Sequence, residues 1–510
     1  MPDPHDSISQ HYHQRTKYDP KTLVTKDLDW DKQPSPFKEY KIGASLDLKP
    51  YLSTQPEAAT EKNFWHRLSR LLFCSYGLTV GMLTQQGDPV YLRTTPSAGG
   101  LYPAEVYLIS RGTPLLAAGL YNYQPQSHSL LHFWDNDVWG ALQNACFWHP
   151  ALDATQVAIV VTGVFYRSFW RYRDRAYRRI FLDAGHLLGN LELAGTMNDF
   201  RPHLIGGFMD EAVNRVLYLN SQEEGTIAVL ALADLLDVTQ NLPLAPTALA
   251  SSTHRNYPDI ADGELLDYLH RASQIPETDN PPTLKQLAVE RQDDLPQRDK
   301  YNFPFCLKVP TKNAPLDWGQ HLTDLETTML KRRSTRAYNG ANLTLDELRA
   351  LLDFTYQPQN SLDQGFDPKP DYFALNLIET FLAVSGVDGL EEGCYYYAPK
   401  AQELRQIRFK NFRRELHFLC LGQNLGRDAA VVLFHTADLE KAVSQYGDRA
   451  YRYLHLDAGH LGQRLNLAAV RLGLGVSGIG GFFDDEVNEV LGIPIDEAVL
   501  YITTLGRPRY

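Results

Sequence analysis

The sequence has few cysteines and no long apolar run, and both absences narrow its class. Its five cysteines are scattered without Cys-x-x-Cys or other metal-ligand spacing, which favours buried free thiols in a reducing compartment over disulfides or a zinc site. Stretches such as Val157 to Val161 are far too short to cross a bilayer, and the first residues lack the apolar segment of a signal peptide. We therefore expect a cytoplasmic protein with no membrane association and no metal.

An excess of positive charge is also missing. Lysine and arginine number 49 against 61 aspartates and glutamates, a formal net charge of -12 that argues against a nucleic-acid-binding surface. What is present is the composition of a globular protein, with 44% hydrophobic and 22% charged residues. At roughly 150 residues per domain, the chain is too long for one hydrophobic core.

The sequence repeats itself at one offset. YRDRAYRRIFLDAGH begins at Tyr172 and YGDRAYRYLHLDAGH at Tyr446, which is 446 minus 172, or 274, residues later. The same offset relates the IGGF at Ile205 to the IGGF at Ile479. Such a repeat indicates two copies of one structural unit. We divide the chain into a first copy at 1–240, a proline-rich connector at 241–325 and a second copy at 326–510.

Each copy mixes helical and extended apolar patterns, so the expected class is α+β. Residues 64–77 and 343–356 have the spacing of amphipathic helices, and one short helix is expected in the connector near Glu264 to Ala272. Buried strands are predicted for 104–109, 157–165, 430–436 and 498–506. The helices that carry LDAGH contain small residues, which would allow a close contact between the copies.

Basic residues and a hydroxyl gather at the start of the second copy. LKRRSTRAY places Arg332, Arg333, Ser334 and Arg336 within five residues, just before a predicted helical segment, and TLGRPRY at the end of the chain adds Arg507. Guanidinium groups bind phosphate through paired hydrogen bonds. The pattern predicts a phosphate grip, with a solvated basic turn as the alternative.

A loop of small residues stands out in the first copy. TTPSAGGLYP contains Pro96, Ser97, Ala98, Gly99 and Gly100, where backbone groups can approach a flat ligand without obstruction by Cβ atoms. The alternative is a plain turn between two strands.

The LDAGH repeats place Asp183 and His186 at the same positions as Asp457 and His460. No second metal ligand follows either histidine at helical or strand spacing. We therefore expect these side chains to make structural hydrogen bonds rather than to bind a metal.

In combination, RRSTR, PSAGGLYP, LDAGH, GIGGF and the terminal GRP resemble the nitroreductase superfamily of FMN-dependent oxidoreductases. YHQRTKYDP and the YxDRAYRxxxLDAGH block are similar to its SagB-type branch, which includes the azoline dehydrogenases of peptide natural-product pathways. The resemblance covers nearly all of both copies. It implies two tandem nitroreductase-like domains, each with a central, mainly antiparallel sheet flanked by helices.

The resembled enzymes are homodimers whose FMN sites are built from both subunits. One subunit supplies the RRSxR-type grip, the glycine pair and a basic residue near the C-terminus, and the other supplies the PSxxxxxP loop. Carried over to this chain, the glycine pair is Gly480 and Gly481. The duplication then implies a pseudo-dimer within one chain.

Comparison of the copies predicts that one of the two sites is lost. Tyr372 and Phe373 stand where the first copy has Ala98 and Gly99, so two rings would fill that space. In the first copy, the segment opposite the grip, 51–56, contains no basic residue.

The basic residue at the end of the chain has no counterpart either. Ala233 or Asp234 stands opposite Arg507, and a carboxylate there would repel phosphate. The first copy has kept the loop and the second copy has kept the grip, and in the resembled enzymes these parts belong to the same site. We therefore expect one FMN per chain.

Candidate catalytic residues precede the two DRAYR motifs. The resembled azoline dehydrogenases use a Lys-Tyr pair there, whereas this chain has Arg171 and Tyr172 in the first copy and Gln445 and Tyr446 in the second. The missing lysine weighs against azoline oxidation. A lowered pKa, favoured by Arg171 and Arg175, could make Tyr172 a base, and Tyr446 is its counterpart. The alternative is that these residues only tie the start of a helix to its neighbours.

The predicted function is that of an FMN-dependent oxidoreductase with ping-pong hydride transfer to or from a small or peptide-derived substrate. Dehydrogenation of such a substrate and reduction of a nitro or quinone compound are both open, and NAD(P)H is one candidate donor. The alternative is a flavin-free binding or scaffolding protein that lost catalysis with one of its sites. The intact basic motifs of the second copy favour the enzyme.

Overall fold

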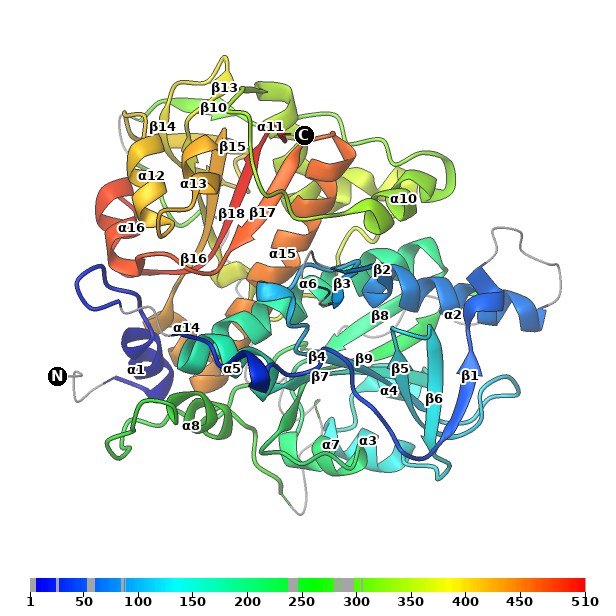
Figure 1. Cartoon of the computed structure of the whole chain (residues 1–510). Helices are drawn as coiled ribbons and strands as arrows, with labels where there is room; N and C mark the ends of the chain where they lie inside the picture. The colour runs from blue at the N-terminus through cyan, green and yellow to red at the C-terminus, as the bar shows by residue number, and fades with distance from the viewer. Residues whose placement is uncertain are drawn as a thin grey trace.

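The computed structural model describes residues 6–23, 27–52, 60–83, 87, 89–236, 246–278, 284, 298–303 and 306–509. It contains two seven-stranded sheets with the same strand order (Figure 1). The first is ordered β1 (Ala44–Asp47), β6 (Ser129–Trp134), β5 (Gly119–Gln124), β4 (Ala104–Ser110), β7 (Val157–Val164), β9 (Glu224–Asp234) and β8 (Phe200–Ile205). The second is ordered β10 (Lys308–Pro310), β15 (Glu403–Arg408), β14 (Gly393–Ala398), β12 (Glu379–Val384), β16 (Val431–Asp438), β18 (Glu497–Gly506) and β17 (Gly475–Ile479).

All neighbouring strands in both sheets are antiparallel, which confirms the expected α+β fold of two tandem domains. Equivalent helices flank the two sheets. In the first half these are α2 (Thr60–Tyr76), α3 (Trp139–Ala145), α4 (Pro150–Asp153), α5 (Phe165–Tyr172), α6 (Ala176–Met197) and α7 (Asp210–Val216). In the second half they are α11 (Leu345–Tyr356), α12 (Arg413–Leu419), α13 (Asn424–Asp428), α14 (Leu439–Tyr446), α15 (Ala450–Arg471) and α16 (Asp484–Leu491).

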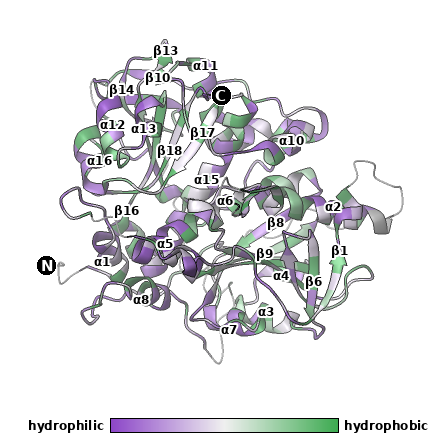
Figure 2. Cartoon of the chain, viewed as in Figure 1, coloured by the Kyte–Doolittle hydropathy of each residue, from purple (hydrophilic) through white to green (hydrophobic). Residues whose placement is uncertain are grey.

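Each sheet is covered on both faces, and strand β4 shows why its sequence is apolar throughout. Val106 and Leu108 face the core that runs between the two halves, whereas Tyr107 and Ile109 pack with α3 and α7 on the other face. Alternate side chains of a strand point to opposite faces, so a strand covered on both sides needs apolar residues at every position. Figure 2 shows hydrophobic residues along the strands and mainly hydrophilic ones on α1 and α5 at the edge.

The two halves meet at α6 and α15, which carry the LDAGH motifs and lie at the centre of the molecule (Figure 1). A Cβ at Gly185 would lie 2.9 Å from the Cα of Gly459, and a Cβ at Gly459 would lie 2.3 Å from the carbonyl oxygen of Leu182. Any larger residue at either glycine would push the helices apart. The expected close contact through small residues is confirmed.

Two short helices outside the sheets occupy equivalent places. Helix α1 (Ile8–Arg15) lies near the start of the first copy, and α8 (Leu265–Ala272) lies in the expected connector, close to the predicted bounds. Arg178 donates to the carbonyl of His13 at 2.7 Å, and its counterpart Arg452 donates to the carbonyl of His270 at 2.6 Å. This equivalence has an offset of 257 residues, 270 minus 13, so a search at 274 misses it. We infer that the second copy begins near residue 264.

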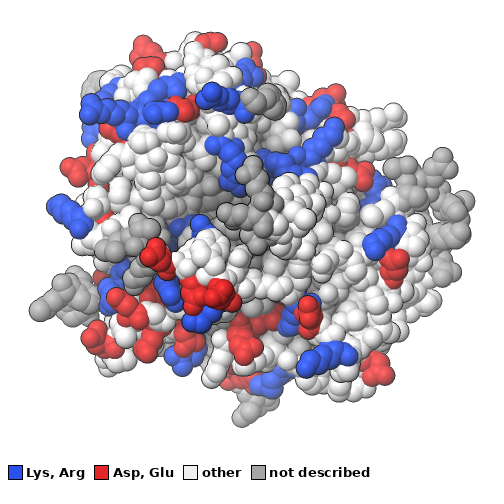
Figure 3. All heavy atoms as spheres, in the orientation of Figure 1, with Lys and Arg blue, Asp and Glu red and all other residues white. Residues whose placement is uncertain are grey.

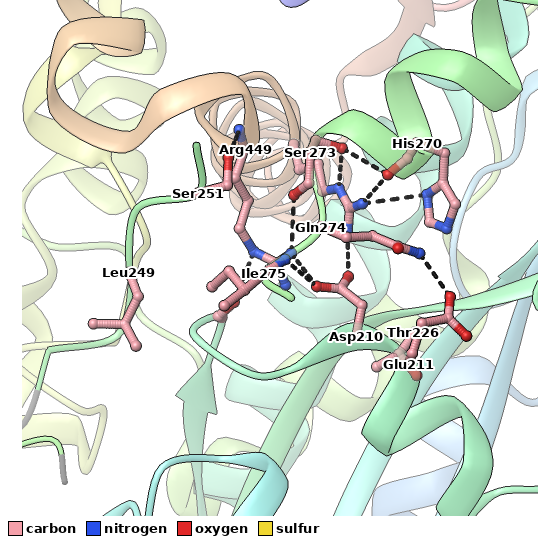
Figure 4. A network of polar contacts seen from close by, with 12 residues as sticks. Asp210, Glu211, Thr226, Leu249, Ser251, His270, Ser273, Gln274, Ile275 and Arg449 are labelled. Carbon is pink, nitrogen blue, oxygen red and sulfur yellow. Dashed lines mark hydrogen bonds and ion pairs between the residues drawn. The ribbon is translucent and has the colours of Figure 1, made fainter. Parts of the chain in front are cut away.

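A buried ion-pair cluster joins each of these segments to both halves. Asp210 of the first copy pairs with Arg449 of the second at 2.6 Å (Figure 4). It also pairs with Arg452 of the second copy at 2.6 Å. Ser273, just after α8, accepts two hydrogen bonds, one from Arg452 on its hydroxyl oxygen and one from Arg449 on its carbonyl oxygen. The arginines of the second DRAYR motif therefore hold the two copies together through a buried ion-pair cluster.

The same cluster occurs in the other half with the copies exchanged. Asp484 of the second copy pairs with Arg175 at 2.8 Å and with Arg178 at 2.7 Å, and Thr16 takes the place of Ser273. Arg175 is thus engaged by Asp484 and is not directed at Tyr172.

Within the described ranges, no helix is both long and apolar enough to cross a membrane. Acidic and basic side chains are interspersed over the face drawn in Figure 3. The five cysteines are unpaired, and all but Cys306 are buried.

Candidate active site

The small-residue loop of the first copy is held by one carboxylate of α6. Ser97 donates its hydroxyl proton to Asp183 at 2.6 Å, and the backbone N–H of Ala98 donates to the same carboxylate at 3.2 Å. The Ser97 hydroxyl oxygen accepts a hydrogen bond from the Tyr102 N–H at 2.8 Å. Pro96, half-buried, leads into this arrangement. Asp183 is structural, as expected, but the sequence did not reveal that it holds this loop.

The pKa of Asp183 makes the stability of this arrangement depend on pH. Burial raises that pKa from 3.8 to about 7, against the lowering effect of the hydrogen bonds from Ser97 and Ala98. Because the folded state keeps its proton to a higher pH than the unfolded state, this group contributes stability below pH 4 that is lost between about pH 4 and about pH 7.

We expect Asp183→Asn to remove this pH dependence. The free energy of unfolding of the wild type should fall relative to the variant by up to about 4 kcal/mol across that interval. Urea unfolding of both proteins at the two ends of the interval measures the difference. A difference that does not change with pH would contradict the assignment.

Gly99 brings the loop against the two candidate catalytic residues. Its φ of 68° is a conformation that favours glycine, and a Cβ there would lie 2.7 Å from the Tyr172 hydroxyl and 3.2 Å from Cδ of Arg171. The neighbouring Gly100 has a φ of 67°, but a Cβ there would meet nothing within 4 Å. Tyr172 and Arg171 therefore line the loop at Gly99.

The expected lowering of the Tyr172 pKa is wrong. Burial raises that pKa, and the nearby guanidinium groups of Arg179 and Arg171 do not offset it. The earlier expectation counted Arg175 as a neighbour, but Arg175 pairs with Asp484. At neutral pH the Tyr172 hydroxyl is protonated and can donate a hydrogen bond.

Arg179 connects Tyr172 to the glycine pair of the second copy. Its guanidinium lies 3.7 Å from the centre of the Tyr172 ring, and its Nη1 lies 2.7 Å from the position of a Cβ at Gly480. A Cβ at Gly481 would lie 3.0 Å from Leu421. Arg179 was not among the predicted site residues, although its replacement by Tyr453 in the second copy was a signal in the sequence.

The grip of the second copy reaches the loop of the first through Arg332. This buried side chain donates from Nε to the carbonyl of Thr94 and from Nη2, at 3.2 Å, to the carbonyl of Arg93. Burial lowers the pKa of Arg332 to about 10. Parts from both copies therefore meet at one place.

The other grip residues are more exposed. Arg333 is half-buried and donates from Nη1 to the carbonyl oxygens of Leu330 and Arg332, Ser334 is half-buried, and Arg336 is exposed. These residues follow the end of α10 (Thr323–Lys331) instead of leading directly into a helix as expected. The next helix in the chain, α11, begins at Leu345, nine residues after Arg336.

The Arg507 side chain is engaged by other residues of the second copy. It donates to a carboxylate oxygen of Glu347 at 2.8 Å and to the carbonyl of Asn342 at 3.2 Å. In the first half, Arg67 and Asp234 take the places of Glu347 and Arg507. They pair at 2.7 Å, so the same contact is made with the charges exchanged. The glutamate offsets much of the charge that Arg507 could offer a phosphate.

The strand register decides which residue of the first copy corresponds to Arg507. Gly475 pairs with Gly506 in the second sheet, and Arg201 pairs with Ala233 in the first. The residue after Ala233, Asp234, is therefore the structural counterpart of Arg507. Of residues 51–56, the proposed counterpart of the grip, 53–56 lie outside the described residues.

Several polar atoms around the loop are buried without a hydrogen-bond partner among the described residues. They are Nη1 of Arg332, Nε of Arg179 and the hydroxyl oxygens of Thr94 and Thr95. Buried donors without partners are costly, so this set fits a ligand that carries negative charge and acceptor atoms. Cβ atoms at Gly99 and Gly480 would each lie 2.7 Å from a first-copy side chain, the Tyr172 hydroxyl and Nη1 of Arg179, so these glycines allow both polar groups to reach this place. These features fit the FMN that the resemblance implies.

The equivalent place in the other half is filled by aromatic rings. Phe373 stacks on Tyr453 at 5.2 Å between ring centres, and a Cβ at Gly206 would lie 2.6 Å from the Phe373 ring. Tyr372 stacks on His460 at 4.4 Å. Phe373 therefore packs against Gly206, the counterpart of Gly480, and that the two rings exclude a second flavin stays a prediction.

The connector also enters this filled place. A Cβ at Gly207 would lie 2.3 Å from Leu249, and the Tyr453 hydroxyl donates to the carbonyl of Leu249 at 2.9 Å. The N–H of Ser251 donates to the carbonyl of Tyr446 at 3.0 Å. Tyr446, the third catalytic candidate, therefore lies in the filled half and not beside Gly99.

Comparison with known proteins identifies relatives of both halves. The model of the nitroreductase family matches residues 69–233 and 329–507. A Methanocaldococcus jannaschii protein named as a nitroreductase is 36% identical over 183 residues, which cover 36% of this chain and 90% of that protein. The microcin B17-processing protein McbC of Escherichia coli is 25% identical over 150 residues, 28% of this chain and 55% of McbC, so the match spans about half of that relative.

A solved structure covers the whole arrangement. The crystal structure of a protein from Anabaena variabilis, described as a nitroreductase, is 68% identical to this chain. The match has a TM-score of 0.94 and covers 99% of this chain and 100% of the other.

Proposed function

Because the chain belongs to the nitroreductase family and is an oxidoreductase, we propose that it binds one FMN in a composite site formed by its two copies. The observation that carries this proposal is Arg332. It comes from the second copy, is bonded to the loop of the first, and has a buried Nη1 without a partner. A guanidinium in that state needs an acceptor, and a phosphate or a flavin carbonyl oxygen supplies one.

Each part of the composite site has a separate task in this proposal. The loop at Pro96, Ser97, Ala98, Gly99 and Gly100 lies against one side of the ring system. Gly480 and Gly481, with Arg179 and Leu421 packed against them, form the other side. The phosphate is held by Arg332, Arg333, Ser334 and Arg336, with Arg507 contributing less because it is paired with Glu347.

FMN bound here would supply two-electron hydride chemistry. In a ping-pong cycle, one substrate would donate a hydride to the flavin and leave before a second substrate accepts the electrons. Tyr172 and Arg171 contact the loop at Gly99 and would orient the substrate, with the protonated Tyr172 hydroxyl as a hydrogen-bond donor. Tyr446 has no such place, because it lies beside Tyr453 in the filled half. The substrate is a small or peptide-derived molecule, and NAD(P)H is the proposed electron donor.

A flavin titration tests the proposal. We expect the visible absorption of purified protein titrated with FMN to reach a plateau at one FMN per chain. Two per chain would show that the rings of Phe373 and Tyr453 yield to a second flavin. Protein that stays colourless with excess FMN would overturn the proposal.

Variants of the grip test the phosphate contacts. Arg333→Ala with Arg336→Ala should raise the dissociation constant of FMN at least tenfold, about 1.4 kcal/mol, because two guanidinium contacts to phosphate are lost. Arg111→Ala is the control, since this exposed arginine lies at the end of β4, away from the loop. Equal affinity in the double variant and the control would remove both residues from the phosphate site.

A further inference from the structure

Three arginines lie close to Tyr172 in the sequence, and only in the half that has kept its loop. They are Arg171, Arg173 and Arg179, and the positions 274 residues later are Gln445, Gly447 and Tyr453. The filled half therefore has no charge at any of these places. We propose that the three arginines form an anion-binding subsite at the open side of the flavin site, for a substrate that carries a carboxylate or phosphate group. The inference rests on the proposed function.

Arg179 provides the buried charge of this subsite. The residue is only 8% exposed, and no ion pair or hydrogen bond joins its guanidinium to another described residue. Its guanidinium contacts the Tyr172 ring and lies against Gly480. Asp183, one turn further along α6, uses its oxygens on Ser97 and Ala98. A buried guanidinium left without an acceptor is costly, so an anionic ligand would stabilise this arrangement.

Arg171 places a second positive charge at the same ring. It is exposed in the last turn of α5, its guanidinium lies 5.8 Å from the centre of the Tyr172 ring, and its Cδ is at Gly99. No carboxylate lies within ion-pair distance of it in the described part of the chain. Two like charges at one ring repel each other until an anion lies between them.

Arg173 adds a third positive charge, and it does so in a backbone conformation that is unfavourable for any residue with a Cβ. Its φ of 50° and ψ of -138° are rarely adopted by residues with a Cβ, and the equivalent Gly447 has a φ of 62° and a ψ of -156°. In the filled half a Cβ at Gly447 would lie 2.1 Å from the carbonyl oxygen of Ser251, so only glycine fits there. The open half has an arginine in the same strained conformation, stacked 5.6 Å from the centre of the Phe169 ring.

The anion is not expected to be the phosphate of FMN. Arg332, in the proposed phosphate grip, contacts the carbonyl groups of Arg93 and Thr94 at the start of the loop. Arg171 contacts Gly99, five residues further along the chain. The two sets of arginines therefore act on different parts of the loop. The anion bound by Arg171, Arg173 and Arg179 would therefore belong to the substrate or electron donor, which is the second ligand of the site.

The neutral residues of the filled half supply the test variants. We expect FMN-loaded wild type, titrated with 4-nitrobenzoate and with its neutral methyl ester while flavin absorbance is followed, to bind the acid at least tenfold more tightly. Arg171→Gln with Arg173→Gly, which copies Gln445 and Gly447, should lose this preference and retain one FMN per chain. Arg173→Gly alone relieves the strained conformation and should lose part of the preference. Arg111→Gln is the charge control and should keep it.

A second measurement identifies the source of the anion. The rate of flavin reduction by NADPH and by NADH is compared in the wild type and the double variant. If the variant reacts more slowly with NADPH and still binds the nitro acid like the wild type, the anion is the phosphate of the donor, and the subsite stands.

Three results would overturn the inference. One is an unchanged preference for the acid together with unchanged reduction by NADPH. Another is loss of FMN from the double variant, which would assign the arginines to the cofactor. The third is wild-type protein that binds no FMN, which removes the proposed function as well and is recognised before any variant is made.

Discussion

Phenylalanine in place of Gly99 should weaken FMN binding strongly. The Cβ of the new side chain would lie 2.7 Å from the Tyr172 hydroxyl, and the φ of 68° disfavours any residue but glycine. The second half shows the result, since Phe373 occupies the equivalent place and packs on Tyr453 and Gly206. We expect the dissociation constant of FMN to rise at least about 100-fold, or about 2.7 kcal/mol, measured by absorbance titration.

Two adjacent glycines provide a matched control for this experiment. Gly99→Ala and Gly100→Ala introduce the same strain, because the φ values are 68° and 67°, but only the Cβ at Gly99 would meet Tyr172. Gly99→Ala should weaken FMN binding, while Gly100→Ala should leave it close to the wild type. Equal losses in both variants would mean that backbone strain, and not lost space, is responsible.

The second large effect is expected for stability, from Asp210→Ala. Asp210 is the carboxylate partner of Arg449 and Arg452, and all three side chains are 1% exposed. Removing one partner of a buried ion pair leaves uncompensated charge and typically costs about 3–5 kcal/mol. We expect a loss of at least that size in the free energy of unfolding, measured by urea denaturation followed by circular dichroism.

Its control is Asp262→Ala at an exposed ion pair. Asp262 pairs with Arg15 at 2.7 Å, but its side chain is 89% exposed, so solvent replaces the partner. This variant should unfold at the same urea concentration as the wild type. If Asp210→Ala also unfolds there, the cluster shown in Figure 4 does not hold the copies together.

Much of the architecture could be predicted because the motifs repeat. The offset of 274 residues identified the two copies, and the glycines of LDAGH indicated a close helix contact that Gly185 and Gly459 make. The substitution of Tyr372 and Phe373 for small residues identified the half that is filled. In each case the information lies in residue types at matched positions, which sequence comparison reads directly.

The same method misassigned residues whose roles depend on partners far along the chain. Arg175 was expected to act on Tyr172 because it is three residues away, but its guanidinium pairs with Asp484, 309 residues later. Helix α8 forms in the predicted connector, but its equivalence to α1 was not recognised because it has a different offset from the rest. Arg179 was not considered, since its importance comes from contacts with Tyr172 and Gly480.

The sequence by itself determined that the protein is a duplication, that loop and grip survive in different copies, and which half carries the rings. Only the tertiary structure decided that Arg332 reaches the loop at Thr94, that Glu347 binds Arg507, and that Leu249 enters the filled half. The physical reason is that residue types and local backbone preferences are properties of short stretches of sequence. The partner of a buried charge, and the segment that fills a given space, depend on how the whole chain packs.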